Sequence, residues 1–260
     1  MSLLMMKLLL LFVLIYMIIP YVITRIMGIG VAIRGRSGRQ IALTFDDGPH
    51  PLYTPRLLDL LKRKGIKATF FVLGSKAEQH PELTRRIHME GHQIGIHNYT
   101  HLPNWLMSTR RIREMHVQRT ADIVERITGE RPTFYRPPWG ILNIGDLFTL
   151  RKTYRIVLWS VLGRDWGKAR KSRPLKERIL SQLEPGSIIL LHDSGDTWGA
   201  VPDAPGRMIA SLEEVFEDVR FQGYKCVRAD ELLQNAHGAR SELPDAFGRV
   251  DTWRSTNKGA

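Results

Sequence analysis

The sequence predicts an α/β fold in which about seven parallel strands form a closed or nearly closed barrel, preceded by one transmembrane helix. Short apolar runs alternate with amphipathic stretches of helical period along residues 40–234. A helix separates each predicted strand from the next, which is the pattern of parallel sheets. Residues 8–24 carry no charge, and together with the apolar residues 3–6 they approach the length needed to span a bilayer, about 20 residues, so a transmembrane helix is expected at 3–25.

The barrel elements follow one another in a regular order, beginning with a strand at 41–45 and a helix at 54–64. Thr54 is the expected N-cap of this helix, Pro55 its first residue and Gly65 its end. The remaining strands are expected at 67–72, 93–96, 133–135, 155–159, 187–191 and 224–227, and the helices at 75–90, about 108–128, about 143–152, 174–183 and 206–221. A doubly wound open sheet is the alternative, but no G-x-G-x-x-G motif follows the first strand.

Both ends of the chain are predicted to lie outside the barrel. Residues 3–25 are interpreted as a signal anchor, with a cleaved signal peptide as the competing interpretation. The apolar stretch is longer than a usual signal-peptide core, and no A-x-A site follows it. Residues 26–39, rich in Gly and Arg, are expected to be a basic linker. Residues 235–260 are polar without an apolar period, which predicts a loose tail.

The chain is strongly basic, with 38 Lys and Arg against 26 Asp and Glu and a formal charge of +12. Such a charge favours anionic surroundings such as lipid headgroups or wall polymers. The basic residues are scattered and not interleaved with aromatic residues, which argues against a nucleic-acid partner. The single cysteine, Cys226, excludes an intrachain disulfide and a multi-cysteine metal site.

Polar and titratable side chains follow five of the predicted strands, at the strand ends where parallel barrels carry their active sites. These residues are Asp46, Asp47, His97, His101, Arg136, Asp165, His192 and Asp193. A single Asp after a strand is usually a helix cap, but five strand ends with such groups on one rim are hard to obtain from caps alone. The adjacent acids Asp46 and Asp47 are unusual because successive strand residues point to opposite faces.

The spacing His97-x-x-x-His101 brings two imidazoles within reach of one metal ion. One carboxylate would complete a three-ligand site with open positions for water, as catalytic zinc sites require. A zinc-protease helix needs Glu directly after the first His, and Asn98 stands there instead.

Five ordered motifs resemble those of the polysaccharide deacetylase family, the NodB-homology fold of carbohydrate esterase family four. They are TFDDGP (44–49), HNYTH (97–101), RPPWG (136–140), RDW (164–166) and LLHD (190–193), and the match spans about 40–232. The resemblance identifies residues 40–234 as a polysaccharide deacetylase domain. It implies a distorted (β/α) barrel that removes acetyl groups from N-acetylated sugars of a polymer. It also implies one divalent metal ion, commonly zinc, with cobalt, manganese or nickel as alternatives.

The resemblance also assigns roles to individual residues. Asp47, His97 and His101 would hold the metal ion. Asp46 would be the general base that takes a proton from the attacking water. Arg136 would position Asp46 and keep it ionised.

At the other end of the site, the resemblance makes His192 the acid that protonates the leaving amine. Asp165 would orient the His192 ring and raise its pKa. The backbone N–H of Trp139 would stabilise the oxyanion, and Pro138 and Trp166 belong to the same substrate-binding surface.

The sequence departs from the family pattern at two places. Ser160 and Leu162 stand where acids are often found, and Trp139 stands where Tyr is commoner. The first departure puts a secondary contact in doubt, and the second leaves the backbone donor intact. Four tryptophans are candidate platforms for sugar rings, with core or loop packing as the alternative for each. They are Trp105, Trp139, Trp166 and Trp198.

We therefore expect a metal-dependent N-deacetylase acting on N-acetylglucosamine-type residues of an extracytoplasmic polysaccharide, with peptidoglycan as the favoured substrate. One alternative is a catalytically retired, glycan-binding protein, which would normally lack a base, an acid or a ligand. Another is a deacetylase of an N-acetylated glycolipid, a xylan ester or a small amide. We expect a monomer whose partners are a glycan and, through the N-terminal helix, a membrane.

The positive charges beside the N-terminal helix conflict with this location. Lys7 and the α-amine flank one side of the uncharged run 8–24, and Arg25, Arg34, Arg36 and Arg39 flank the other, so positive-inside counting places the main domain in the cytoplasm. Long domains often translocate despite such charges. The expectation is a single-pass protein of the cell membrane with an extracytoplasmic catalytic domain.

Overall fold

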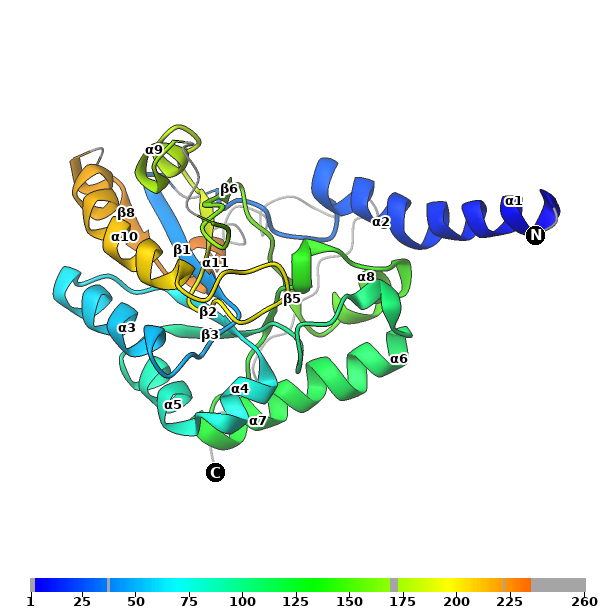
Figure 1. The fold of residues 1–260 in the computed structure, drawn as a ribbon, viewed down its shortest axis with the longest axis horizontal. Helices are drawn as coiled ribbons and strands as arrows, with labels where there is room; N and C mark the ends of the chain where they lie inside the picture. The colour runs from blue at the N-terminus through cyan, green and yellow to red at the C-terminus, as the bar shows by residue number, and fades with distance from the viewer. Residues whose placement is uncertain (1–2, 37, 169–172, 222, 235–260) are drawn as a thin grey trace, which may run out of the picture.

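A curved, parallel sheet forms the centre of the molecule (Figure 1). The computed structural model describes residues 3–36, 38–168, 173–221 and 223–234, so the predicted tail at 235–260 lies outside it. The strands run in the order β5-β4-β3-β2-β1-β7-β6, and β8 also pairs with β1. Their bounds are β1 (Gln40–Asp46), β2 (Thr69–Val72), β3 (Gln93–Ile96), β4 (Phe134–Tyr135), β5 (Arg155–Ile156), β6 (Val161–Leu162), β7 (Ile188–His192) and β8 (Lys225–Val227). The predicted distorted (β/α) barrel is confirmed, with eight short strands in place of about seven.

Helices cover the outside of this sheet (Figure 1). The main ones are α3 (Tyr53–Lys64), α4 (Gly74–Gln79), α5 (Pro81–Met89), α6 (Thr109–Arg111), η4 (Ile112–Gln118), α7 (Arg119–Thr128), α8 (Ile144–Leu150), α9 (Leu175–Leu180), α10 (Ala204–Phe221) and α11 (Ala229–Gln234). Helix α3 ends as predicted at Gly65, in the left-handed conformation that glycine adopts without strain (φ 64°). The N-cap prediction was wrong. Leu52 is the capping residue, and Thr54 lies in the first turn.

Two predicted elements differ in the structure, one helix and one strand. The helix expected at 75–90 is two helices, because Pro81 cannot continue α4 and instead starts α5. The strand expected at 155–159 is shorter than predicted: β5 ends at Ile156 and pairs with β4 at one end of the strand order. A separate strand that was not predicted, β6 at Val161–Leu162, pairs with β7 at the other end. Val157 to Trp159 are buried between them, so the apolar run is continuous although the strand is not.

Apolar side chains fill both faces of the sheet, as expected for parallel strands covered on both sides. In β1, Ile41, Leu43 and Phe45 pack toward the helices and Ala42 packs on the opposite side. All four are essentially inaccessible to solvent, and full burial of a side chain such as Phe45 contributes about 1.5–3 kcal/mol. This packing holds β1, and hence the acids at its end, rigidly in place.

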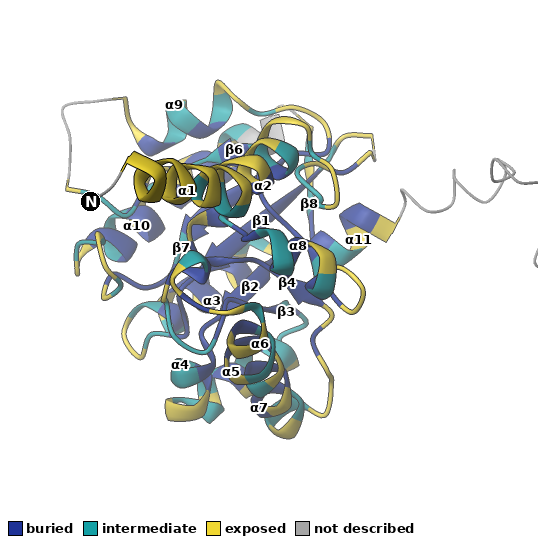
Figure 2. Ribbon diagram, turned by 90° about the vertical axis from the view of Figure 1, so that its right-hand side faces the viewer, coloured by how far each residue is buried: buried dark blue, intermediate teal, exposed yellow. Residues whose placement is uncertain are grey.

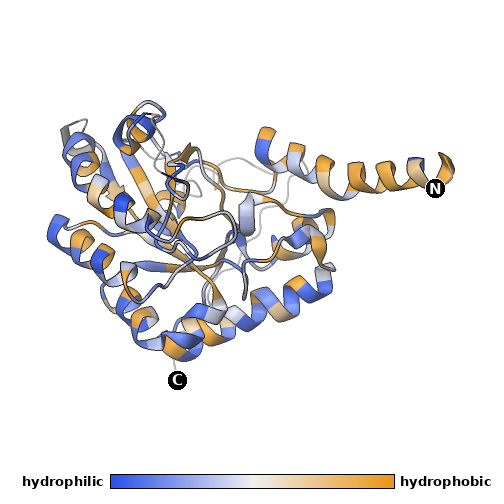
Figure 3. Cartoon of the chain, in the orientation of Figure 1, coloured by the Kyte–Doolittle hydropathy of each residue, from blue (hydrophilic) through white to orange (hydrophobic). Residues whose placement is uncertain are grey.

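The N-terminal helix projects from the barrel (Figure 1). It comprises α1 (Leu3–Val13), η1 (Leu14–Ile18), α2 (Ile19–Tyr21) and η2 (Val22–Ile26). The helix has 24 residues, and an 18-residue window within it has a mean hydropathy of 2.6. It is therefore long and apolar enough to cross a membrane, although a signal sequence has the same properties. Figure 2 shows its exposed surface and Figure 3 its apolar character.

The end of this helix packs on the barrel. The Tyr16 hydroxyl donates a hydrogen bond to the Met107 carbonyl (3.1 Å), and Arg25 Nη1 donates to the Trp159 carbonyl (3.2 Å). The chain that follows, expected to be a linker, also contacts the sheet. Ala32 forms an isolated parallel bridge with Val157, and Gly35 donates its N–H to Gly186.

Candidate active site

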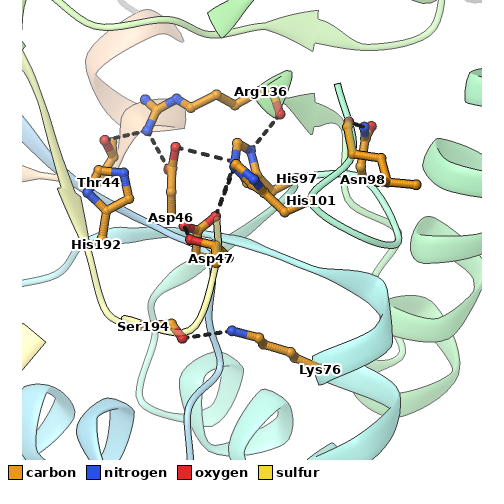
Figure 4. Close-up of polar contacts among 12 residues, drawn as sticks. Thr44, Asp46, Asp47, Lys76, His97, Asn98, His101, Arg136, His192 and Ser194 are labelled. Atoms are coloured by element: carbon orange, nitrogen blue, oxygen red, sulfur yellow. Dashed lines mark hydrogen bonds and ion pairs between the residues drawn. The ribbon is translucent and has the colours of Figure 1, made fainter. Parts of the chain in front are cut away.

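The two adjacent acids at the end of β1 face the same site. Asp46 is the last strand residue, and Asp47 has a left-handed backbone (φ 76°) that interrupts the alternation of strand side chains. As a result, both carboxylates approach one imidazole: His97 Nε2 lies 3.8 Å from Asp46 Oδ2 and 3.4 Å from Asp47 Oδ1. Figure 4 shows the two acids side by side below Arg136.

Asp47, His97 and His101 form a cluster suited to a metal ion. Their ligand atoms lie within 4.8 Å of one another, and His101 Nε2 is 3.4 Å from Asp47 Oδ1. His97 Nδ1 lies 2.8 Å from the Arg136 carbonyl, so Nδ1 carries the proton and Nε2 is left to coordinate. Burial lowers the pKa of His97 to about 3 and also lowers the pKa of His101. Both rings are therefore neutral, as metal binding requires.

The environment of Asp47 fits a cation. Its Oδ1 atom is buried without a hydrogen-bond partner, although it faces two imidazole nitrogens. Its Oδ2 atom accepts a hydrogen bond from the Thr197 hydroxyl (2.7 Å). An unpartnered buried carboxylate oxygen is costly unless a cation compensates it, so two imidazoles and one carboxylate here match a divalent ion such as zinc.

Arg136 is fully buried and joins β1 to the segment that follows β5. Its guanidinium donates to Asp46 Oδ1 (2.7 Å), to the Thr44 hydroxyl (2.8 Å), and to the carbonyls of Val157 and Leu158 (3.1 and 3.0 Å). Burial raises the pKa of Asp46, while the charge of Arg136 opposes this rise. The carboxylate is thus more basic than an exposed aspartate and remains paired with a permanent cation.

His192 and Asp165 form a second pair across the site. His192 Nδ1 lies 2.9 Å from Asp165 Oδ1, and the His192 backbone N–H donates to Asp165 Oδ2 (2.7 Å). Burial alone would lower the pKa of His192, but Asp165, followed by Asp47 and Asp46, raises it to about 9. A raised pKa favours the cationic form of His192 at neutral pH, in which the ring can donate a proton, and Asp47 and Asp46 are close enough to contribute to it.

Aromatic rings line the opening of the site on two sides. Trp139 contacts His101 edge-on (4.2 Å between ring centroids), and the largely exposed Trp198 contacts Trp139 (6.2 Å). Trp166 contacts His192 on the acid side (5.3 Å). Trp105 makes no ring contact with this group among the described residues.

The RPPWG segment turns sharply beside these rings. Pro138 is buried within the 3-10 turn η5 (Pro138–Gly140), and both Trp139 (φ 56°) and Gly140 (φ 70°) are left-handed. A Cβ atom on Gly140 would lie 2.6 Å from the Trp159 ring, so only glycine fits there.

Left-handed backbone at residues other than glycine is concentrated at this site. Among the described residues it occurs at Asp47, Asn98, Trp139 and Arg164. Each is a proposed site residue or the direct neighbour of one. Such conformations are maintained only where the surrounding structure enforces them, which indicates that these strand ends are held in preset positions.

Sequence reasoning missed a buried polar network beneath the histidines. Asn98 Nδ2 donates to Asn104 Oδ1 (2.8 Å), and the Tyr135 hydroxyl donates to Asn98 Oδ1 (3.0 Å). Asn104 Nδ2 donates in turn to Tyr135 and to Asp146 Oδ2 (2.9 and 2.8 Å). The network joins Asn98, the residue directly after His97, to Tyr135, the residue directly before Arg136. It therefore helps to position both His97 and Arg136. Asn98 stands within the HNYTH motif without a role that its residue type predicts, and none of the five motifs includes Asn104, Tyr135 or Asp146.

Thr197 and Asp193 were also not assigned roles. Thr197 holds one oxygen of Asp47, as described above. Asp193 is fully buried and accepts a hydrogen bond from the Thr54 hydroxyl (2.5 Å). A Cβ atom on Gly48 would lie 2.2 Å from Asp193 Oδ2, so Gly48 allows the turn after Asp47 to pack against this carboxylate.

The contact of Thr197 with Asp47 leads to a testable prediction. Thr197→Val keeps the shape of the side chain and removes the hydroxyl donor. We expect metal affinity to fall by about 10-fold or more, as is usual when a group that orients a ligand is lost. Competition titration with a chelator measures this affinity. Thr197→Ser, which retains the hydroxyl, is the matched control and should keep affinity within about 3-fold. Equal affinities for Val and Ser would contradict the role of the hydrogen bond.

Comparisons with known proteins show which family the chain belongs to. The family model for polysaccharide deacetylase matches residues 34–148. A peptidoglycan-N-acetylglucosamine deacetylase from Bacillus cereus is 39% identical over 200 residues, covering 76% of this chain and 69% of that protein. A peptidoglycan-N-acetylmuramic acid deacetylase from Bacillus subtilis is 36% identical over 192 residues, and this chain spans 38% of its length. The crystal structure of a peptidoglycan N-acetylglucosamine deacetylase superposes with a TM-score of 0.73 at 32% identity, covering 81% of this chain and 96% of that one.

Proposed function

Because this chain belongs to the polysaccharide deacetylase family, we propose that it hydrolyses the acetamide group of N-acetylglucosamine-type residues in peptidoglycan. The observation that carries the proposal is the convergence of a candidate metal cluster, a buried acid paired with arginine, and a cationic histidine on one rim. The names of similar proteins support peptidoglycan as the substrate.

Three residues would hold the metal ion: Asp47, His97 and His101. When bound, a divalent ion such as zinc polarises the acetamide carbonyl and lowers the pKa of the attacking water from about 16 toward 7. Asp46 takes the proton from this water, and Arg136 fixes the direction of its carboxylate.

The second proton transfer uses the opposite side of the site. His192, which is cationic, donates its proton to the sugar nitrogen as the bond to the acetyl carbon breaks. Asp165 holds the ring by its Nδ1 atom, so that Nε2 is the donating atom. We assign the backbone N–H of Trp139 to the developing oxyanion. No covalent intermediate is required, because the nucleophile is water.

The aromatic rings provide a binding surface for the glycan. Trp139 and Trp198 on the metal side and Trp166 on the acid side would stack on sugar faces. The buried Pro138 supports the turn that presents Trp139. Exposed tryptophan beside a catalytic centre is consistent with an extended polymer substrate rather than a small amide.

We further propose that the N-terminal helix anchors the enzyme in the cell membrane with its catalytic domain outside the cytoplasm. The apolar composition of Leu3–Ile26 and the wall substrate of similar proteins support this placement. Protease treatment of intact cells tests it. Digestion of the domain is expected, and protection of the domain would place the active site in the cytoplasm and contradict the wall substrate.

The proposed activity is tested by acetate release. The full-length chain, purified in detergent with zinc, is expected to release acetate from peptidoglycan or chito-oligosaccharides. Chelator treatment should abolish release, and added zinc should restore it. Absence of acetate from peptidoglycan, chitin fragments, an N-acetylated glycolipid and an acetylated xylan alike would overturn the deacetylase assignment.

The pH dependence of activity is a further prediction. His192 must be protonated to donate, and its pKa is raised to about 9, so kcat is expected to fall as the pH rises through about 9. Asp165→Asn removes the main charge that raises this pKa, so the fall should move to lower pH. A pH–rate profile of both proteins measures the shift. An alkaline limb at the same pH in both would show that His192 is not the titrating acid.

A further inference from the structure

A strongly basic cavity of about 1040 Å³ lies beside the active site. Its walls come from η2, the residues around β6, and the helices α9 and α10. Six basic side chains line it: Arg25, Arg164, Lys168, Arg173, Arg178 and Arg207. Among the described residues that line it, Asp165 is the single acid.

The charge in this cavity is largely uncompensated. Both oxygens of Asp165 are already bonded to His192, and Arg207 pairs with Asp203. Within the described part of the chain, the other five cations have no carboxylate within 4.0 Å. Arg178 instead donates to the carbonyls of Gly163 and Arg173 (both 2.8 Å). Several like charges around one cavity repel one another, and a bound anion would relieve this repulsion.

The walls also offer hydrogen-bond donors that lack partners. Trp159 is only 9% exposed, and its indole Nε1 has no hydrogen-bond partner although it is buried. Guanidinium groups and an indole N–H donate and do not accept. Planar guanidinium groups match the oxygens of phosphate in particular, so the chemistry of the cavity fits a phosphate or pyrophosphate group.

The cavity lies between the N-terminal helix and the acid side of the active site. Arg25, in the last turn of the apolar helix, forms one wall and stacks on the Trp159 ring (4.4 Å). Trp166, on another wall, contacts the catalytic His192 (5.3 Å). In Figure 1 the strand β6 is seen between α9 and the end of this helix. An anion held here is near both the membrane end of the helix and the group that protonates the leaving amine.

We propose that this cavity binds the phosphate or pyrophosphate of a membrane lipid that carries the N-acetylated saccharide. The enzyme then deacetylates a lipid-linked saccharide at the membrane surface. This inference rests on the proposed deacetylase function for the chemistry at the sugar. It adds that the substrate is a lipid-linked saccharide and that the basic cavity is a second binding site, which holds the phosphate of this substrate.

Binding of inorganic pyrophosphate to the full-length chain in detergent micelles is the direct test. Isothermal titration calorimetry should show binding that the double variant Lys168→Gln, Arg173→Gln weakens by about 10-fold or more, because each lost contact is a charge-assisted hydrogen bond. The control is Arg36→Gln, Arg151→Gln, which removes the same charge on a different surface. Any pyrophosphate that binds at the metal site contributes equally in the wild-type chain, the cavity variant and the control variant, so it does not produce a difference among them. Equal affinities in the three would overturn the site.

Acetate release from two matched substrates tests the role of the cavity in catalysis. The same N-acetylated disaccharide is attached to an alkyl chain through pyrophosphate or through a neutral glycosidic bond. The wild-type chain should prefer the pyrophosphate substrate by about 10-fold in kcat/KM, and the cavity variant should lose this preference while the control keeps it. Equal kcat/KM for both substrates in the wild type would overturn the proposal. Acetate from neither substrate would instead overturn the deacetylase function, and calorimetry would still report the phosphate site.

An ordinary phospholipid headgroup has similar chemistry and is distinguished by reconstitution. The neutral substrate is assayed in phosphatidylcholine vesicles with and without phosphatidylglycerol. Equal activity in both vesicles is expected if the cavity serves the substrate. Activation by phosphatidylglycerol that disappears in the cavity variant would assign the cavity to bulk lipid and overturn its role in substrate binding.

Discussion

Asp46→Asn is expected to reduce kcat for acetate release by about 10²–10⁴-fold, the usual contribution of a general base. Asparagine preserves the shape of the side chain and an oxygen that can accept the Arg136 hydrogen bond, but it cannot take a proton from water. Metal content should not change, because Asp46 is not one of the three clustered ligands. Steady-state kinetics and metal analysis of the same preparation measure both quantities.

Asp47→Ala is the matched control for this division of roles. The substitution removes the carboxylate oxygen that lies 3.4 Å from both imidazole nitrogens, so metal should be lost together with activity. Two results would contradict the assignment: an Asp46→Asn protein that lacks metal, or one that retains wild-type kcat. In either case the adjacent acids would not have the separate functions proposed here.

Arg136→Met is expected to lower the free energy of unfolding by about 3–5 kcal/mol, because it leaves the buried carboxylate of Asp46 without its partner. The guanidinium is completely inaccessible and donates four hydrogen bonds, and the methionine replaces none of them. Thermal unfolding of the full-length chain in detergent measures the loss. Arg85→Met, at an exposed position on α5, is the control and should change stability by no more than about 0.5 kcal/mol.

The same substitution should also change the pH dependence of activity. Arg136 opposes the burial that raises the pKa of Asp46, so its removal raises this pKa further. Because Asp46 must be deprotonated to act as a base, the acid limb of the pH–rate profile should move to higher pH. A variant that unfolds readily but keeps an unshifted acid limb would show that Arg136 supports the fold without tuning Asp46.

Local sequence was sufficient to locate most of the candidate site. Short apolar segments that alternate with helical segments reveal where the strands lie. Site residues follow several of these strands: the acids after β1, the paired histidines after β3, and the His–Asp pair around β6 and β7. Parallel topology then brings those strand ends to one rim. The contacts in the structure place the predicted ligands, Asp46, Arg136, His192 and Asp165 close together. Their catalytic roles stay predictions.

The contacts that tune this cluster have no local signature. Thr197 touches Asp47 across 150 positions of sequence, and Asn104 joins Tyr135 and Asp146 through hydrogen bonds spanning 31 and 42 positions. An isolated threonine or asparagine in a loop has the same sequence pattern whether it caps a turn or orients a metal ligand. The end of β5 at Ile156 and the start of β6 at Val161 had no local signature for a similar reason, since burial continues between them while the pairing partner changes.

The sequence by itself determined the class of fold, the order of the strands along the chain and the residue types available at each strand end. These depend on periodicity and on spacing, which are properties of neighbouring residues. Only the tertiary structure decided that Asp46 and Asp47 face one imidazole, that Arg136 is buried against β1, and that five uncompensated cations surround one cavity between the N-terminal helix and His192. Desolvation and Coulomb interactions depend on distances between segments far apart in the chain, and folding alone sets those distances.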